Sequence, residues 1–239
     1  MEDVRETLAE IDAASERLTA TAAKLTDRDL GEPSRLPGWT RGHVLAHLIR
    51  NTDSCWNLLE WARTGVEVPQ YPSDAARDAG VETNAGRPIA ELRAELRVAV
   101  ERFALQAGTM PASAWPVMIR ARAGWPHPAW FVLNRRWREL EAHHLDLAFG
   151  YTHTDWPRAY VEWELTDTLG AVQLDGGLAA GRVRATDMDV DVSLGEGSEV
   201  SAPGHELLGW LTGRGGSVHE EWPAAPSAWP LPTPGWRPS

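Results

Sequence analysis

The 239-residue chain has one cysteine and one lysine, and each scarcity excludes a kind of chemistry. With Cys55 alone, the chain can form no internal disulfide, no cysteine-based zinc site and no redox pair of neighbouring thiols. With Lys24 alone among 23 basic residues, a Schiff base or a phosphate-binding loop has no suitable lysine. Arginine must therefore supply the positive charge, and any thiol chemistry needs a thiol from another molecule.

Long hydrophobic runs and an excess of basic residues are also missing. No apolar run approaches the roughly 18 residues that a membrane helix needs. The acidic first residues resemble neither a secretory signal nor a transit peptide, so we expect a cytoplasmic protein that does not contact a membrane. The net charge of −11 repels phosphate backbones, so nucleic acid is not an expected partner. A hydrophobic content of 43% is that of an ordinary globular protein.

Apolar residues recur at helical spacing in four long segments. The predicted helices span about residues 4–25, 41–64, 88–108 and 129–149. Thr40 is the expected N-cap of the second helix, and Gly65 is expected to end it. Four long amphipathic helices predict a helical bundle.

The pattern changes after Gly150. A helix over about 158–169 is followed by a glycine-rich break over 176–181, an alternating strand over 188–194, a short strand near Val200 and a helix over 205–212. We therefore predict an α+β fold that is mostly α. The predicted domains are a four-helix bundle over 1–152, a small α+β domain over 153–222 and a tail over 223–239, whose six prolines exclude a helix or an inner strand.

The fourth predicted helix carries two pairs of possible metal ligands. Glu139 and His143 are four residues apart, whereas Glu141 and His144 are three apart, and either spacing places a carboxylate and an imidazole on one side of a helix. His144 lies within the apolar stripe and the first pair lies at its edge. An isolated pair of this kind is more often a core histidine bonded to a carboxylate than a metal site. The residues alone do not choose between the two pairs.

A third ligand could come from the second predicted helix, which contains His43 and His47. By the 3.6-residue turn, His47 lies nearer to the centre of the apolar stripe than His43 does. His47 is therefore the better candidate for a side chain that points inward.

Three segments resemble the mycothiol-dependent maleylpyruvate isomerase family. They are residues 36–48 (LPGWTRGHVLAHL) with Asn51 and 61–65 (WARTG), residues 138–147 (RELEAHHLDL), and residues 213–215 (GRG). The second segment is similar to the family's E-x-x-x-H-x-x-D-L pattern. The resemblance covers nearly the whole chain except the tail, and it implies that the N-terminal bundle is DinB-like.

The resemblance also implies a site. The family holds a divalent metal, usually zinc, and the matching ligands here are His47, Glu139 and His143. Three protein ligands leave a fourth position open, as catalytic zinc sites do, and the thiol mycothiol is expected there. The resemblance further implies a catalytic role for Arg214, for which an arginine at a helix C-terminus is the structural alternative.

The function implied by the resemblance is conversion of maleylpyruvate to fumarylpyruvate by reversible addition of the mycothiol thiolate. The substrate is a dianion, which the negative net charge of the protein would repel. Arg214, together with Arg136 or Arg138, could offset this charge at the site. For Arg136, however, a surface ion pair is the commoner role. Three alternatives stay open: a mycothiol S-transferase acting on another electrophile, a metal-hydroxide hydrolase, and a metal-binding module without turnover. The expected oligomeric state is a monomer or a homodimer.

Overall fold

The computed structural model describes residues 2–215 and 221–231, so the last eight residues of the predicted tail lie outside the described residues. The chain packs as two units, Met1–Gly150 and Tyr151–Ser239. Among the helices that are described, none combines the length and the apolar character needed to cross a bilayer.

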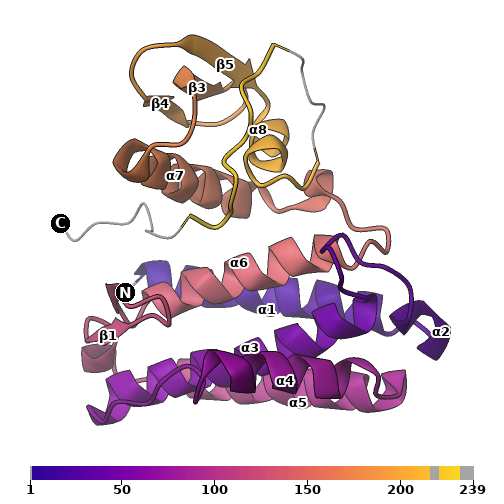
Figure 1. Ribbon diagram of the computed structural model, residues 1–239. Helices are drawn as coiled ribbons and strands as arrows, with labels where there is room; N and C mark the ends of the chain where they lie inside the picture. The colour runs from indigo at the N-terminus through magenta and orange to yellow at the C-terminus, as the bar shows by residue number, and fades with distance from the viewer. Residues whose placement is uncertain (1, 216–220, 232–239) are drawn as a thin grey trace. The chain divides into compact units, whose positions relative to one another are not determined.

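The first unit is built around four long helices (Figure 1). They are α1 (Glu2–Ala22), α3 (Arg41–Thr64), α5 (Ile89–Gly108) and α6 (Phe131–Asp146). Both α1 and α3 pack against α5 and α6, so α1 and α3 lie diagonally across the bundle. Leu18, Leu48, Leu96 and Leu140, one from each helix, are at most 1% exposed. The predicted helical bundle is thus confirmed.

Local signals at both ends of α3 set its limits. At the start, the Thr40 backbone N–H donates to Nδ1 of His43 (3.2 Å), and the Thr40 hydroxyl lies 2.8 Å from the same nitrogen. At the end, Gly65 adopts a φ of 75° and donates to the Trp61 carbonyl (2.8 Å). The helix therefore spans the predicted 41–64, which confirms that prediction.

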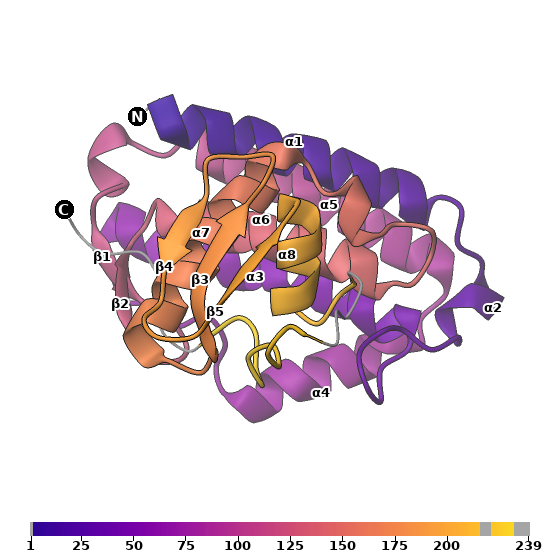
Figure 2. The same cartoon turned by 90° about the horizontal axis from the view of Figure 1, so that it is seen from above.

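The second unit combines two helices with a three-stranded sheet (Figure 2). Its elements are α7 (Arg158–Asp175), β3 (Ala180–Ala185), β4 (Asp191–Ser193), β5 (Ser198–Ala202) and α8 (Gly204–Leu211). β3 is the central strand, antiparallel to β4 and parallel to β5, and α8 packs against α7 and β5. Together with the bundle, this unit confirms the predicted α+β, mostly α fold.

Prolines shape the described part of the tail, residues 223–231, which contains no helix or strand. Two indole N–H groups attach it to the second unit. Trp210 donates to the Pro223 carbonyl, and Trp229 donates to the Thr168 hydroxyl, each at 3.1 Å. This segment therefore runs over α7 and α8.

The central strand β3 was not predicted, because Gly181 was assigned to a glycine-rich break. Gly181 is needed inside the strand for a steric reason. A Cβ atom at this position would lie 2.4 Å from the carbonyl oxygen of Gly197, the residue that precedes β5. Glycine thus permits close approach of two backbones, a use that composition alone does not reveal. The strand predicted over 188–194 is correspondingly shorter, Asp191–Ser193, and α7 runs six residues past its predicted end.

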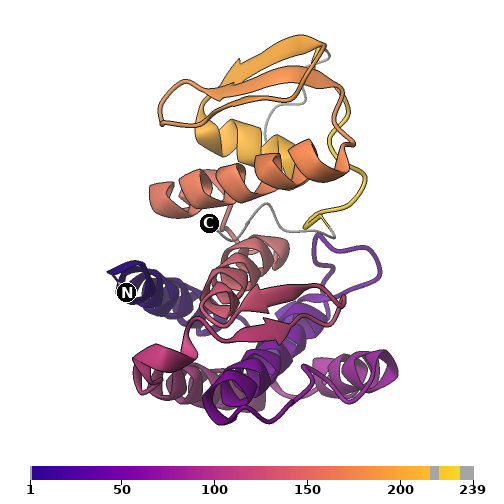
Figure 3. The same cartoon turned by 90° about the vertical axis from the view of Figure 1, so that its left-hand side faces the viewer.

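Several short elements of the first unit were also missed. They are α2 (Asp27–Leu30), α4 (Asp74–Ala85), the 3-10 helix Ala112–Ala114 and the hairpin of β1 (Met118–Arg120) with β2 (Pro126–Pro128); a further 3-10 helix, His153–Asp155, opens the second unit. Ser73 caps α4, which packs on α3 at the outside of the bundle (Figure 3). The last bundle helix ends at Asp146, three residues before its predicted end.

Candidate metal centre

One side chain of α3 and two of α6 converge inside the first unit. The Nε2 atom of His47 lies 2.9 Å from Oε2 of Glu139, and the Nε2 atom of His143 lies 3.3 Å from the same oxygen. One possible ligand atom from each residue lies within 4.8 Å of the other two. The two imidazole rings meet edge to face, with centroids 4.7 Å apart.

Local and tertiary geometry both contribute to this convergence. Because Glu139 and His143 are four residues apart on α6, their side chains lie one above the other on the same helix face. His47 reaches them because α3 packs against α6, and its side chain is only 6% exposed. The cluster thus links two helices whose residues are about 90 positions apart in the chain.

The spacing of the donor atoms fits a divalent cation. Zinc bonds of roughly 2.0–2.2 Å place the ligand atoms of a tetrahedral site about 3.3–3.5 Å apart. The measured separations of 2.9 and 3.3 Å are close to that edge length. Two imidazole nitrogens and one carboxylate oxygen are donors that zinc and its neighbours among the first-row metals accept. These three side chains could therefore hold such an ion with little rearrangement.

The two histidines are held in place differently. Nδ1 of His143 lies 2.8 Å from Oδ2 of Asp146, whose side chain is 2% exposed. A carboxylate partner on Nδ1 leaves the Nε2 lone pair available to a metal and fixes the ring orientation. The His47 ring instead packs 5.5 Å from the Trp39 ring, and its buried Nδ1 has no hydrogen-bond partner within the described part of the chain. On its Nδ1 side, ring packing rather than a hydrogen bond within the described residues therefore holds His47.

Burial and hydrogen bonding shift the pKa values of the three residues in the cluster in different directions. Burial lowers the pKa of His143, but its bonds to Asp146 and Glu139 outweigh this and raise that pKa to about 9. For His47 burial prevails over the attraction of Glu139 and lowers the pKa. Burial alone would raise the pKa of Glu139, yet the two histidines hold it well below its usual range. Glu139 is thus in the form that binds a cation, whereas His143 must release a proton and the Nε2 atom of His47, which faces the Glu139 carboxylate, must carry none.

The alternative ligand candidates have other partners. Glu141 accepts from Arg17 at 2.5 Å, and His144 lies 2.8 Å from the Thr21 hydroxyl, so both residues face α1. His43 is engaged in the cap of α3, and its Nε2 lies 3.4 Å from Glu82. The structure therefore brings together His47 with the pair spaced by four residues, and it places the other candidates elsewhere.

Three neighbouring arginines on α6 differ in their environment. Arg136 is 1% exposed and donates Nη1 to the Leu48 carbonyl (3.1 Å) and to Asn51 Oδ1 (2.9 Å), so it attaches α6 to α3. The expectation of a surface ion pair for Arg136 is wrong.

Arg138 is also buried, at 9% exposure. Arg135 belongs to no motif of the sequence, and the signal that could have revealed it is its spacing of four residues from Glu139.

Arg214 belongs to the second unit, whereas the three possible ligands belong to the first. Its backbone N–H donates to the Gly209 carbonyl (2.9 Å), which fixes the turn after α8. Its Nη1 donates to the Thr212 carbonyl (3.2 Å), and its guanidinium carbon lies 4.6 Å from the centroid of the Trp229 ring. The side chain is half-buried and ordered by these contacts.

Cys55, the single cysteine, lies on α3 inside the bundle. It is 4% exposed, and its Sγ lies 3.7 Å from Asn51 Oδ1. Burial raises the pKa of its thiol to about 11. Because the nucleophilic form is the thiolate, Cys55 is an inert core residue at neutral pH.

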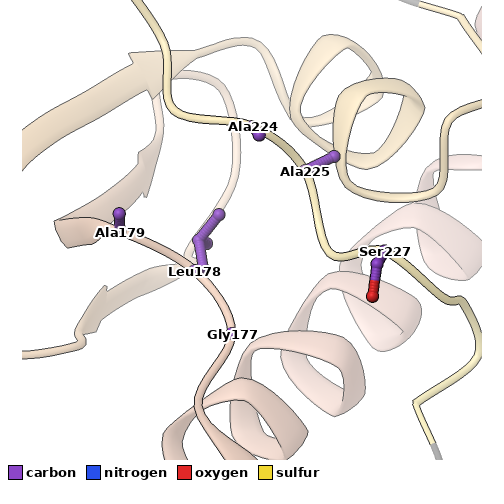
Figure 4. Close-up of a pocket in the computed structure, with 6 residues that line it drawn as sticks. All are labelled: Gly177, Leu178, Ala179, Ala224, Ala225 and Ser227. Carbon is purple, nitrogen blue, oxygen red and sulfur yellow. The ribbon is translucent and has the colours of Figure 1, made fainter.

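The second unit contains a separate hollow of about 510 Å³ (Figure 4). Its lining residues are Gly177, Leu178, Ala179, Ala224, Ala225 and Ser227. They come from the segment before β3 and from the described tail, and they offer one hydroxyl group and no charged side chain. This hollow therefore holds none of the groups that acid–base, nucleophilic or metal chemistry needs.

The fold and the cluster define a helical-bundle protein with a two-histidine, one-carboxylate site. A family model for the mycothiol maleylpyruvate isomerase N-terminal domain matches residues 11–148, which contain all three residues of the cluster. The chain belongs to this family.

Two solved structures have the same fold. One is the mycothiol-dependent maleylpyruvate isomerase, with a TM-score of 0.81, 24% sequence identity and coverage of 92% of this chain and 91% of that chain. The other is a histidine-to-alanine mutant of the mycothiol-dependent maleylpyruvate isomerase, with a TM-score of 0.80, 24% identity and coverage of 89% and 90%. No curated protein sequence matches the chain.

Proposed function

We propose that this protein is a metal- and mycothiol-dependent isomerase that converts maleylpyruvate to fumarylpyruvate. The observation that carries the proposal is the convergence of His47, Glu139 and His143 within the segment matched by the family model. Zinc is the ion we assign to the site, because its preferred donors and bond lengths fit the cluster. We assign mycothiol as the thiol, because the family model is of a mycothiol-dependent type and Cys55 is buried.

In this proposal, each residue of the site has a defined task. A bound metal would lower the pKa of the added thiol. Addition of the thiolate would convert the cis double bond to a single bond that can rotate, and elimination of the thiolate would restore the double bond as trans. His47 and Glu139 hold the ion from two different helices, and Asp146 keeps the His143 ring turned toward it. Burial of Cys55 keeps the protein's own thiol out of the reaction.

The test of this function is an assay of the purified protein with zinc, mycothiol and maleylpyruvate. We expect fumarylpyruvate to form catalytically, without net consumption of mycothiol, as followed by chromatography. Accumulation of a mycothiol conjugate with an electrophile would indicate an S-transferase instead. A water-derived product that forms without thiol would indicate a hydrolase.

We also assign to Arg214 the task of binding a substrate carboxylate or the developing enolate oxygen. Thr212 and Trp229 order its guanidinium, a planar group of the kind that pairs with carboxylates. Lysine keeps the charge but not the paired donors, so Arg214→Lys should lower kcat/KM by roughly 30- to 1,000-fold, or about 2–4 kcal/mol of transition-state stabilisation. Metal content and Tm should not change.

The matched control for this variant is Arg184→Lys, at an exposed position of β3 in the same unit. It should be kinetically normal. If Arg214→Lys is kinetically normal as well, Arg214 serves only to hold the end of α8.

A further inference from the structure

Arg135 lies on the same face of α6 as the residues of the candidate metal centre. It precedes Glu139 by four residues and His143 by eight. With a rise of 1.5 Å per residue, its backbone lies roughly 6 Å from that of Glu139 along the helix axis. The two side chains are close enough for the carboxylate to affect the pKa of the guanidinium. Arg135 thus extends the site by one helical turn.

The partners of Arg135 leave its charge unpaired. Nη1 lies 3.5 Å from His127 Nε2, Nη2 lies 3.4 Å from Gln70 Oε1, and the guanidinium carbon lies 5.5 Å from the Trp125 centroid. Both polar contacts are longer than the usual 2.9–3.0 Å. Across residues 2–215 and 221–231, no carboxylate lies within ion-pair distance of this guanidinium.

Those two polar partners are neutral and already engaged. Burial, followed by the charge of Arg135, lowers the pKa of His127 to about 4, and its Nδ1 donates to the Pro128 carbonyl at 2.9 Å. The oxygen of Gln70 accepts a shorter bond of 2.7 Å from the Arg122 backbone N–H. These groups position the guanidinium without neutralising it.

Arg87, another half-buried arginine of the same unit, has carboxylate partners: it pairs with Glu91 at 2.9 Å and with Glu95 at 2.7 Å. A half-buried cation without a counter-ion costs stability, and a carboxylate in the bidentate geometry that arginine favours would remove that cost. Arg135 therefore has the properties of an anion-binding group.

We propose that Arg135 binds a carboxylate of the substrate and thereby selects anionic electrophiles for this site. This inference rests on the proposed function, and it adds the group that would recognise one end of a dicarboxylate. A carboxylate held by Arg135 would lie about one helical turn from Glu139.

The binding test uses maleate, a dicarboxylate without the keto group, and the zinc-loaded full chain. Calorimetry should show that Arg135→Gln weakens maleate binding by 10-fold or more, and that Arg135→Lys weakens it less. Arg97→Gln is the matched control, since Arg97 is exposed on α5, 3.9 Å from Glu101, and its loss changes the net charge equally. The control should bind maleate as the wild type does. Equal affinities of wild type and Arg135→Gln, or no binding by the wild type, would overturn the proposal.

A second measurement uses the wild type and does not depend on the folding of a variant. Diethyl maleate has the same double bond without the charges, so it should not compete with maleate for the site. Effective competition by the diester would contradict a carboxylate-binding role for Arg135. Absence of isomerase turnover with maleate binding that depends on Arg135 would refute the proposed function and leave this inference intact. Isomerase turnover with an unchanged KM in Arg135→Gln would support the proposed function and refute this inference.

Discussion

Replacement of His143 by alanine is expected to remove the bound metal and the activity together. His143 Nε2 is one of three donor atoms that converge in the bundle, and its ring is oriented for this purpose by Asp146. Loss of an outer-shell partner alone typically costs 10–100-fold in metal affinity. Loss of a direct ligand should cost more than 100-fold, so the dialysed variant should retain little zinc by elemental analysis and show no isomerase turnover above background.

The matched control is His144→Gln, which changes the next residue of the same helix. His144 faces α1, where its Nε2 lies 2.8 Å from the Thr21 hydroxyl, so its replacement should reduce stability but not metal content. A His144→Gln variant that loses zinc, beside a His143→Ala variant that retains it, would show that Glu141 and His144 form the real ligand pair.

Omission of mycothiol is expected to abolish isomerisation by the zinc-loaded protein. The only thiol of the chain is 4% exposed and has a pKa raised to about 11 by burial, so it cannot replace a low-molecular-weight thiol at pH 7. Addition of mycothiol to the same sample should restore fumarylpyruvate formation. The measurement is product formation as a function of mycothiol concentration, which should extrapolate to background at zero thiol.

Cys55→Ala completes this experiment. Because Cys55 acts as a small core residue, the variant should keep the wild-type rate with mycothiol and lose on the order of 1 kcal/mol of unfolding free energy. Full wild-type activity in thiol-free buffer would exclude a thiol-dependent mechanism. A folded but inactive Cys55→Ala variant would assign the chemistry to the protein's own thiol.

Much of the bundle could be predicted because its signals are local. The spacing of apolar residues indicates which face of a helix is buried, and caps such as Thr40 and Gly65 define its ends within a few residues. The strand β3 could not be predicted in this way. Gly181 is permitted there only because the backbone at Gly197 approaches it, and such a contact between distant residues leaves no local pattern.

The same distinction applies to the candidate site. By itself, the sequence determined that Glu139 and His143 share one face of a helix, that His47 is a better inward candidate than His43 on another, and that a single cysteine excludes a chain-encoded redox pair. It left two Glu/His pairs open, because both spacings are compatible with one helix. Only the tertiary structure decided which pair has free donor atoms, since α1 engages Glu141 and His144 and α3 supplies His47 to the other pair. It also decided that Arg136 bonds to the backbone of α3, while Arg135 has no carboxylate partner among the residues that the structure describes. Helix periodicity is a property of neighbouring residues, whereas the partner of a side chain depends on how helices far apart in the chain pack together.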